Sequence, residues 1–351
     1  MRPLLSGAGG FLGDALLRRL PDGAVCLLRG SDHAARAATL ARRSGVPVAG
    51  VSGDVRAPRW GLDDGLDALR GEVDSVVHLA SETSWSAPWE RLQHVNVDGA
   101  EEAVHVAARL GVPLIHASSL FSARSDHDVV PEALVPEHPD LSDYERSKCR
   151  AEWVVADAAR RAGVPVRIAR IGGLLGDHVP TPGRRSVPKV PMVRLLVTSG
   201  WPWVPYVRGA RLDVAPRDLV AARLLELCDE APTGAVDVLN VGLGMAAPLV
   251  GSLLAEASAR TADGPNPVPR PMPAPAWVLR RASAGADRVG LGPGAARTIG
   301  LRYLSSSTLY PGRGNLEAVL PIGDLVTAMG FPPPSTPALP GYYAPWLTSS
   351  S

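Results

Sequence analysis

A tyrosine and a lysine four residues apart form the most suggestive chemical pair in this sequence. The stretch YERSK spans residues 144–148, and Lys148 is one of only two lysines among 36 lysines and arginines. Residues four apart share one face of an α-helix, so Tyr144 and Lys148 would project together. A neighbouring ammonium group favours the phenolate and lowers the pKa of a tyrosine, which predicts proton exchange near neutral pH. The same compact ammonium could hydrogen-bond the ribose of a nicotinamide cofactor, a role that the wider arginine fork fills poorly.

Two adjacent serines supply a candidate partner for this phenol. They belong to HASSLFS, residues 116–122, at the end of an expected strand. The carboxyl ends of parallel strands are where ligands bind in open α/β sheets. A serine there could hydrogen-bond a substrate carbonyl oxygen while Tyr144 protonates it. The residues themselves leave the choice between Ser118 and Ser119 open.

A glycine-rich turn near the N-terminus is typical of dinucleotide binding. SGAGGFLG, residues 6–13, lies between an apolar strand and an apolar-periodic helix. Glycines at this spacing allow the backbone to approach a pyrophosphate closely. At the end of the next expected strand, Arg29 occupies the position that meets the adenosine ribose, and Arg36 follows about two helical turns later. An arginine there suits a 2′-phosphate, so the sequence predicts NADP(H) as the cofactor.

The elements that must position these groups alternate along the first 170 residues. Apolar runs predict strands at residues 2–6, 24–29, 46–51, 74–80, 112–118 and 164–170, with a further strand at 236–242. Amphipathic stretches predict helices at 11–20, 32–43, 89–110 and 144–162. This alternation is typical of an α/β fold, here a Rossmann-type doubly wound parallel sheet with a smaller C-terminal substrate-binding domain.

The domain boundaries follow from where the alternation stops. We expect residues 1–171 plus about 211–242 to form the dinucleotide-binding domain, and residues 172–210 plus 243–330 to form the smaller substrate domain. Residues 331–351 are proline-rich and are expected to form an extended tail.

Composition excludes several classes of partner. The 351 residues are 46% hydrophobic and 20% charged with a net charge of +1, which gives no electrostatic case for nucleic acid or an anionic membrane. No apolar run reaches the length of a membrane span, and the N-terminus predicts no signal peptide. Three cysteines, Cys26, Cys149 and Cys228, show no metal-site spacing. We therefore expect a cytoplasmic protein with no bound metal.

Together these features resemble the extended branch of the short-chain dehydrogenase/reductase superfamily, over residues 1 to about 245. Within that branch, GAGGFLG with CLLRG, WERLQHVNVDGA, YERSKCRAEWVV and LDVAPRDLVAA look most like the thioester-reductase and fatty acyl-CoA reductase group. The resemblance implies Ser119, Tyr144 and Lys148 as catalytic residues, with Ser118 the alternative to Ser119. Arg170 resembles an arginine that usually precedes proline, but Ile171 follows it here, so the substrate-side turn is expected to differ.

The resemblance also implies a set of cofactor-binding residues. Asp54 in GDV would contact the adenine, HLAS at 78–81 would line the central part of the cofactor, and Asn96 would be a structural asparagine. The full implied set is Gly7, Gly9, Gly10, Phe11, Leu12, Gly13, Arg29, Arg36, Asp54, Val55, Leu79, Ala80, Ser81, Asn96, Ser118, Tyr144 and Lys148.

The expected activity is NADP(H)-dependent reduction of a carbonyl group, or of a carrier-bound or CoA thioester, in bacterial secondary metabolism. The chain has no room for adenylation or carrier modules, so the substrate would be a free small molecule or one delivered on a separate carrier protein. The aromatic residues Trp201, Trp203, Tyr206 and Trp277 of the expected substrate domain suggest that this substrate is hydrophobic.

Two other function classes remain open. A nucleotide-sugar epimerase or dehydratase using NAD(H) would share the fold, but Arg29 counts against it. A non-enzymatic cofactor-sensing protein would typically lose Tyr144 or Lys148, which this chain keeps. The helices expected at 89–110 and 144–162 could pair across a homodimer.

Overall fold

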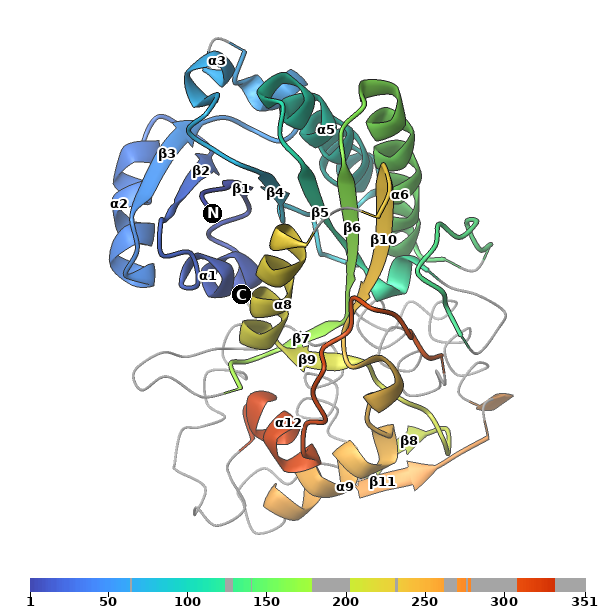
Figure 1. The fold of residues 1–351 in the computed structure, drawn as a ribbon. Helices are drawn as coiled ribbons and strands as arrows, with labels where there is room; N and C mark the ends of the chain where they lie inside the picture. Colours follow the sequence, from blue (N-terminus) through green and yellow to red (C-terminus); the bar gives the residue numbers. More distant parts are fainter. Residues whose placement is uncertain are drawn as a thin grey trace.

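A seven-stranded parallel sheet forms the centre of the molecule (Figure 1). This computed structural model describes residues 1–63, 65–123, 129–139, 141–178, 203–230, 233–261, 270–275, 277–278 and 308–331. In chain order the strands are β1 (Leu4–Ser6), β2 (Ala24–Leu28), β3 (Val48–Ser52), β4 (Val76–His78), β5 (Leu114–Ser119), β6 (Val166–Ile171) and β10 (Val236–Val241). All of them were predicted from apolar runs, with ends that differ by a few residues.

The order of the strands places a crevice at the centre of the sheet. The order is β10-β6-β5-β4-β1-β2-β3, and each neighbouring pair is parallel. The chain builds outward from β1 in one direction through β3, and then returns to β4 on the other side of β1. Ligands bind at such a switch point, outside the carboxyl ends of the strands. The predicted Rossmann-type doubly wound sheet is confirmed.

Helices cover both faces of this sheet. One face packs against α1 (Phe11–Leu17), α2 (His33–Ser44) and α8 (Arg217–Asp229), and the other against α5 (Gly99–Leu110) and α6 (Asp143–Ala162). Leu4 and Leu5 are both fully buried, yet they belong to the two different core clusters. Successive strand residues point to opposite faces, so a strand buried on both sides needs a continuous apolar run.

The helix expected at 89–110 is interrupted in the structure. It consists of α4 (Trp89–Leu92), a π-helical turn η2 (Gln93–Asp98) and α5. Such π turns occur as local insertions within helices, frequently at functional sites. The helices α5 and α6 pack against each other within the chain.

Several elements that follow β6 in the chain form the lower part of the molecule in Figure 1. They include two small parallel pairs, β7 (Gly173–Leu175) with β9 (Val214–Pro216) and β8 (Trp203–Tyr206) with β11 (Arg270–Pro273), and the helices α9 (Val250–Thr261) and α12 (Ile322–Ala328). The short elements are η1 (Pro58–Gly61), α3 (Leu66–Leu69), η3 (Leu120–Ser122) and η4 (Gly244–Ala246). Leu253 of α9 and Phe331 share one buried cluster with Leu5 of the sheet, so the lower part packs directly on the Rossmann core. The expected proline-rich tail beyond Phe331 lies outside the described residues.

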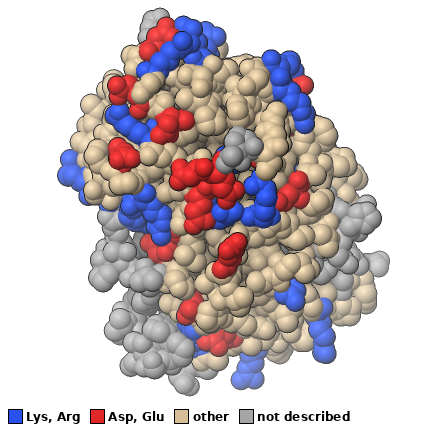
Figure 2. Space-filling view, viewed as in Figure 1, with Lys and Arg blue, Asp and Glu red and all other residues tan. Residues whose placement is uncertain are grey.

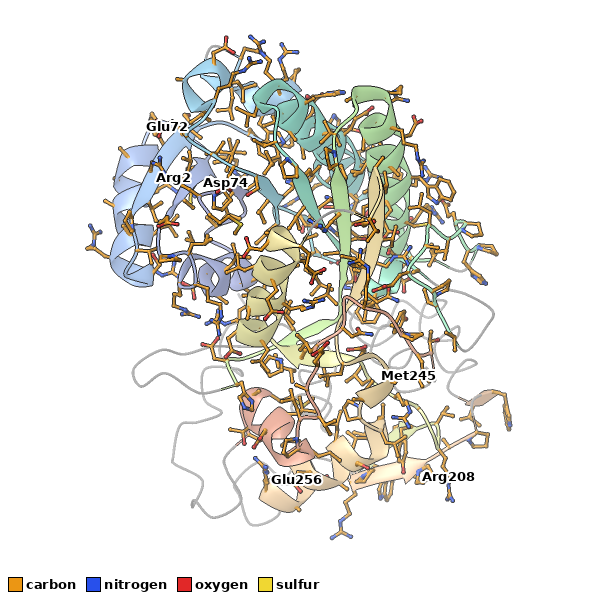
Figure 3. All side chains as sticks on the ribbon, in the orientation of Figure 1. Arg2, Glu72, Asp74, Arg208, Met245 and Glu256 are labelled. Atoms are coloured by element: carbon orange, nitrogen blue, oxygen red, sulfur yellow. The ribbon has the colours of Figure 1, made fainter. Side chains whose placement is uncertain are left out.

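Charged residues at the surface are mixed in sign. Lys and Arg alternate with Asp and Glu on the face seen in Figure 2, in keeping with a net charge of +1. In Figure 3, Arg2 lies beside Glu72 and Asp74, whereas Arg208, Met245 and Glu256 lie in the lower part. Arg2 binds Glu72 through its side chain and Asp74 through its backbone N–H, each at 2.7 Å. Across the described ranges, no helix is both long and apolar enough to cross a membrane.

Candidate active site

A cavity of about 1380 Å³ opens at the carboxyl edge of the sheet. The glycine-rich turn after β1 lines it together with Tyr144 and Lys148 of α6. Of the residues predicted for the site, those that line the cavity are Gly7, Gly9, Gly10, Phe11, Leu12, Gly13, Arg29, Arg36, Asp54, Val55, Leu79, Ala80, Ser81, Ser118, Ser119, Tyr144 and Lys148. The fold therefore gathers residues from five different strand ends around one space, and Asn96 is the predicted residue that it leaves outside.

The backbone of the glycine-rich turn fits a dinucleotide pyrophosphate. Gly7 has φ +77°, and a Cβ there would lie 2.7 Å from the backbone nitrogen of Ala80. A Cβ on Gly13 would lie 2.3 Å from the carbonyl oxygen of Gly7, so both glycines are required by close packing within the turn. A Cβ on Gly9, by contrast, would meet no protein atom within 4 Å. The turn is thus packed tightly from behind and open on the side of the cavity, as close approach of a phosphate requires.

Arginines gather beyond this turn, where β2 and β3 end. The Nη1 of Arg36 donates to the carbonyl oxygen of Arg29 at 2.6 Å. Arg56, which the sequence analysis missed, also lines the cavity and binds both carboxylate oxygens of Asp54, with Nη2 at 2.6 Å from Oδ2. The pKa of Asp54 is held below its ordinary value, chiefly by its hydrogen bonds to Arg56 and also by the charge of Arg29. The carboxylate that we expected to meet the adenine is therefore already paired.

Tyr144 and Ser119 both line the cavity. Both side chains are buried, and the Ser119 hydroxyl is close enough to act on the pKa of Tyr144. Burial raises the pKa of Tyr144 to about 12, although the nearby Ser119 hydroxyl acts to lower it. The predicted downward shift was wrong in direction, because desolvation of the phenolate outweighs the neighbouring groups. The phenol consequently stays protonated at neutral pH, which is the form that can donate a proton.

Lys148 lies in the same buried region. Its Nζ donates to the carbonyl oxygen of Ala117 at 3.1 Å. Burial lowers the pKa of Lys148 to about 8, and the nearby Glu152 partly offsets that effect. The ammonium is thus mostly charged at neutral pH and loses its charge in mildly alkaline solution.

Ser118 faces away from Ser119, into a buried charge pair. Its Oγ donates to Oε1 of Glu152 at 2.6 Å. Glu152 also accepts from Arg170, with Nη2 at 2.7 Å from Oε2, and both side chains are almost fully buried. Arg170, which resembles a family arginine, therefore neutralises a buried carboxylate beneath the site and does not face the cavity.

Asn96 connects the loop after β4 to helix α6. Its Oδ1 accepts from Ser81 Oγ at 2.9 Å and from the backbone N–H of Glu82 at 2.8 Å. Its Nδ2 donates to Ser147 Oγ, one residue before Lys148, at 2.9 Å. Asn96 is buried and positions Ser81, which does line the cavity. Asn96 therefore acts on the cavity indirectly, through Ser81 and the contact with Ser147.

An aromatic wall next to Tyr144 was also missed. Trp85 and Phe121 line the cavity; the ring centroid of Trp85 lies 4.8 Å from that of Tyr144 and 6.2 Å from that of Phe121. Further apolar lining comes from Ile171, Leu174, Leu212 and Val214. Both missed aromatic residues follow the ends of strands, and that position was the available signal.

The aromatic residues expected to serve the substrate do not form this wall. Trp203 and Trp277 are 54% and 62% exposed, and neither lines the cavity. Tyr206 packs against Gly251 and the main core, and Trp201 lies outside the described residues.

Comparison with known proteins agrees with this arrangement. Residues 5–224 match the NAD-binding family model described as "Male sterility protein". The chain is 33% identical over 196 residues to a linear gramicidin synthase protein of Brevibacillus parabrevis, and 32% identical over 196 residues to isonitrile lipopeptide synthase of Streptomyces coeruleorubidus. Each match covers 50% of this chain but only 4% and 13% of those two proteins. In fold, the chain is similar to the terminal R domain of the myxalamid PKS-NRPS pathway, with a TM-score of 0.66 and 20% identity over 94% of this chain and 84% of that one.

Proposed function

This chain belongs to the NAD-binding male sterility protein family of extended short-chain dehydrogenases/reductases, and from that membership we propose that it is an NADP(H)-dependent reductase. Its substrate is hydrophobic. The group that it reduces is either a carbonyl group or a thioester linked to a carrier protein or to CoA. The names of the two relatives, a gramicidin synthase and a lipopeptide synthase, support a place in secondary metabolism. The excess of arginine over lysine supports a bacterial origin. The three free cysteines support a cytoplasmic protein.

The observation that carries this proposal is that Ser119, Tyr144 and Lys148 line the same cavity as the glycine-rich turn. The bound nicotinamide would supply a hydride to the carbonyl carbon. Ser119 holds the carbonyl oxygen, and Tyr144 donates its proton to that oxygen as negative charge develops there. With a thioester, the hemithioacetal formed in this way then breaks its C–S bond, which releases the thiol of the carrier or CoA and leaves the aldehyde. Lys148 binds the ribose hydroxyls and adds positive charge beside the phenol.

The choice of NADP(H) over NAD(H) rests on the arginines at the other end of the cavity. Arg29 and Arg36 both line it, and a guanidinium group binds a phosphate by two charge-assisted hydrogen bonds. The same residues count against a nucleotide-sugar epimerase using NAD(H), the alternative of the same fold.

The hydrophobic nature of the substrate is supported by the wall beside Tyr144. Trp85 and Phe121 present ring surface there, and Leu174 and Leu212 add aliphatic surface. An acyl chain placed against this wall would bury apolar surface, which is favourable by about 25 cal/mol per Å² of apolar surface removed from water.

The proposal is tested by incubating the purified chain with NADPH or NADH and either decanal or decanoyl-CoA. We expect loss of NADPH absorbance with at least one of these substrates, and chromatography of the products distinguishes the aldehyde from the alcohol. Absence of any oxidation, with NAD(H) found tightly bound after purification, would contradict the proposal and favour the epimerase alternative.

A further inference from the structure

The adenosine end of the cavity contains a carboxylate where a phosphate is expected to bind. Asp54 lines the cavity after β3, close to Arg29, whose charge acts on its pKa. The pKa of Asp54 is held below its ordinary value, so this side chain is ionised at neutral pH. An unpaired carboxylate would repel a 2′-phosphate, which carries nearly two negative charges at neutral pH.

Arg56 is the residue that neutralises this carboxylate. Its Nε donates to Asp54 Oδ1 at 3.1 Å, its Nη2 donates to Oδ2 at 2.6 Å, and its backbone N–H donates to Oδ1 at 3.0 Å. The two-pronged contact fixes the guanidinium plane. With this pairing, the positive charges of Arg29 and Arg36 are left uncompensated by Asp54.

We propose that Arg56 is a specificity-determining residue for the phosphorylated dinucleotide, because its pairing with Asp54 cancels the negative charge that Asp54 would otherwise present beside Arg29 and Arg36. The inference rests on the proposed use of NADP(H) and assigns a residue to that preference. It predicts that the Arg56 charge affects binding of NADPH and hardly affects binding of NADH, which has a hydroxyl in place of the phosphate.

Solvent exposure supplies a second readout. The Arg56 side chain is 53% exposed and that of Asp54 is 28% exposed, so the interaction is open to mobile ions. The screening length falls from about 10 Å at 0.1 M salt to about 3 Å at 1 M. If Arg56 acts through its charge, its effect on NADPH affinity therefore becomes smaller in high salt. An effect that came only from shaping the turn would not depend on salt.

The experiment measures dissociation constants of NADPH and NADH by fluorescence titration of the full chain, in low and high salt. The proteins are the wild type, Arg56→Gln, Arg56→Lys and the double variant Asp54→Asn/Arg56→Gln. The NADPH-to-NADH affinity ratio is the quantity compared, since any loss of adenine contact affects both cofactors equally.

We expect wild type to prefer NADPH, and Arg56→Gln to lower the ratio about tenfold, equivalent to about 1.4 kcal/mol. Arg56→Lys keeps most of the wild-type preference for NADPH, and the double variant recovers most of that preference. High salt reduces the differences in the affinity ratio between all of these proteins. An unchanged ratio in Arg56→Gln, or a double variant as weak as the single one, overturns the inference while leaving NADP(H) use intact. A wild type that binds NADH at least as tightly as NADPH overturns the proposed cofactor preference and the inference with it.

Discussion

Ser118 and Ser119 are neighbours on β5, yet their hydroxyl groups act on opposite sides of the strand. Ser118 Oγ donates to Glu152 at 2.6 Å beneath the site, whereas Ser119 lines the cavity with Tyr144 and acts on the pKa of that phenol. The alternation of side chains along a strand is the physical reason. The sequence left open which serine is catalytic, and this geometry favours Ser119.

Replacing each serine by alanine separates the two roles. Ser119→Ala is expected to lower kcat by about 10²–10³, the usual cost of removing one donor to a developing oxyanion, with cofactor affinity unchanged. Ser118→Ala should retain activity but lose about 1–3 kcal/mol of unfolding free energy, because Glu152 loses a buried donor. Steady-state kinetics measures kcat, and urea unfolding measures the free energy of unfolding. An active Ser119→Ala variant together with an inactive, stable Ser118→Ala variant would reverse the assignment.

Two glycines of the turn give a matched pair for cofactor binding. Gly9→Ala adds a methyl group that meets no protein atom, so we expect unchanged thermal stability but at least tenfold weaker NADPH binding, or about 1.4 kcal/mol. Gly13→Ala places its methyl group 2.3 Å from the Gly7 carbonyl oxygen, so it should also lower stability, by about 1–3 kcal/mol. Differential scanning fluorimetry and fluorescence titration report the two effects. Full NADPH affinity in Gly9→Ala would mean that the pyrophosphate does not approach this turn.

The aromatic wall should select for long acyl chains. Trp85→Ala removes the ring packed 4.8 Å from that of Tyr144, and we expect it to lower the ratio of kcat/KM for decanal to that for propanal by roughly 10-fold or more. The matched control is Trp203→Ala, which removes an exposed tryptophan that does not line the cavity and should leave the ratio unchanged. An equal decanal-to-propanal ratio in wild type and Trp85→Ala would show that the acyl chain of the substrate does not bind against Trp85.

Cofactor binding should weaken in mildly alkaline solution. The pKa of Lys148 is lowered to about 8 by burial, so its ammonium is present below that pH and is lost as the pH rises through it. Tyr144, with a pKa near 12, does not titrate in this range. We expect NADPH affinity to fall through about pH 8 in wild type and to be weaker but independent of pH in Lys148→Met. A wild-type affinity that stays constant to about pH 10 would exclude Lys148 as a charged contact to the cofactor.

The charged form of Lys148 is expected to favour cofactor binding, but it destabilises the fold. A folded-state pKa below the ordinary lysine value of 10.5 means that burying the ammonium destabilises the fold, fully so below about pH 8. This contribution diminishes as the pH rises from about 8 toward 10.5. Lys148→Met is therefore expected to be at least as stable as wild type at neutral pH, which urea unfolding would show.

The fold was predictable from sequence because its strands are buried on both faces and therefore appear as apolar runs. Val166–Ile171 and Val236–Val241 are examples, and both were located to within a few residues. The interruption at η2 was not predictable in this way, since the apolar period continues through it. It arises where Asn96 binds the loop after β4 and the helix α6, a tertiary contact between distant segments.

The candidate site was predictable where a motif has fixed local spacing, as in the glycine-rich turn and the pair Tyr144 and Lys148. Trp85 and Arg56 were missed because their places beside Tyr144 and Asp54 depend on loop geometry. The direction of the Tyr144 pKa shift was also wrong, because helical spacing places a lysine nearby but does not reveal how deeply the phenol is buried.

The central claim is that the Tyr144 hydroxyl protonates the substrate during reduction by NADPH. The most direct measurement is single-turnover oxidation of NADPH with a saturating substrate, comparing wild type with Tyr144→Phe and with Tyr206→Phe as a control outside the cavity lining. We predict that Tyr144→Phe slows the turnover by about 10²–10⁴ while its NADPH dissociation constant stays at the wild-type value, and that Tyr206→Phe keeps the wild-type rate. A Tyr144→Phe variant that turns over at the wild-type rate would contradict the account.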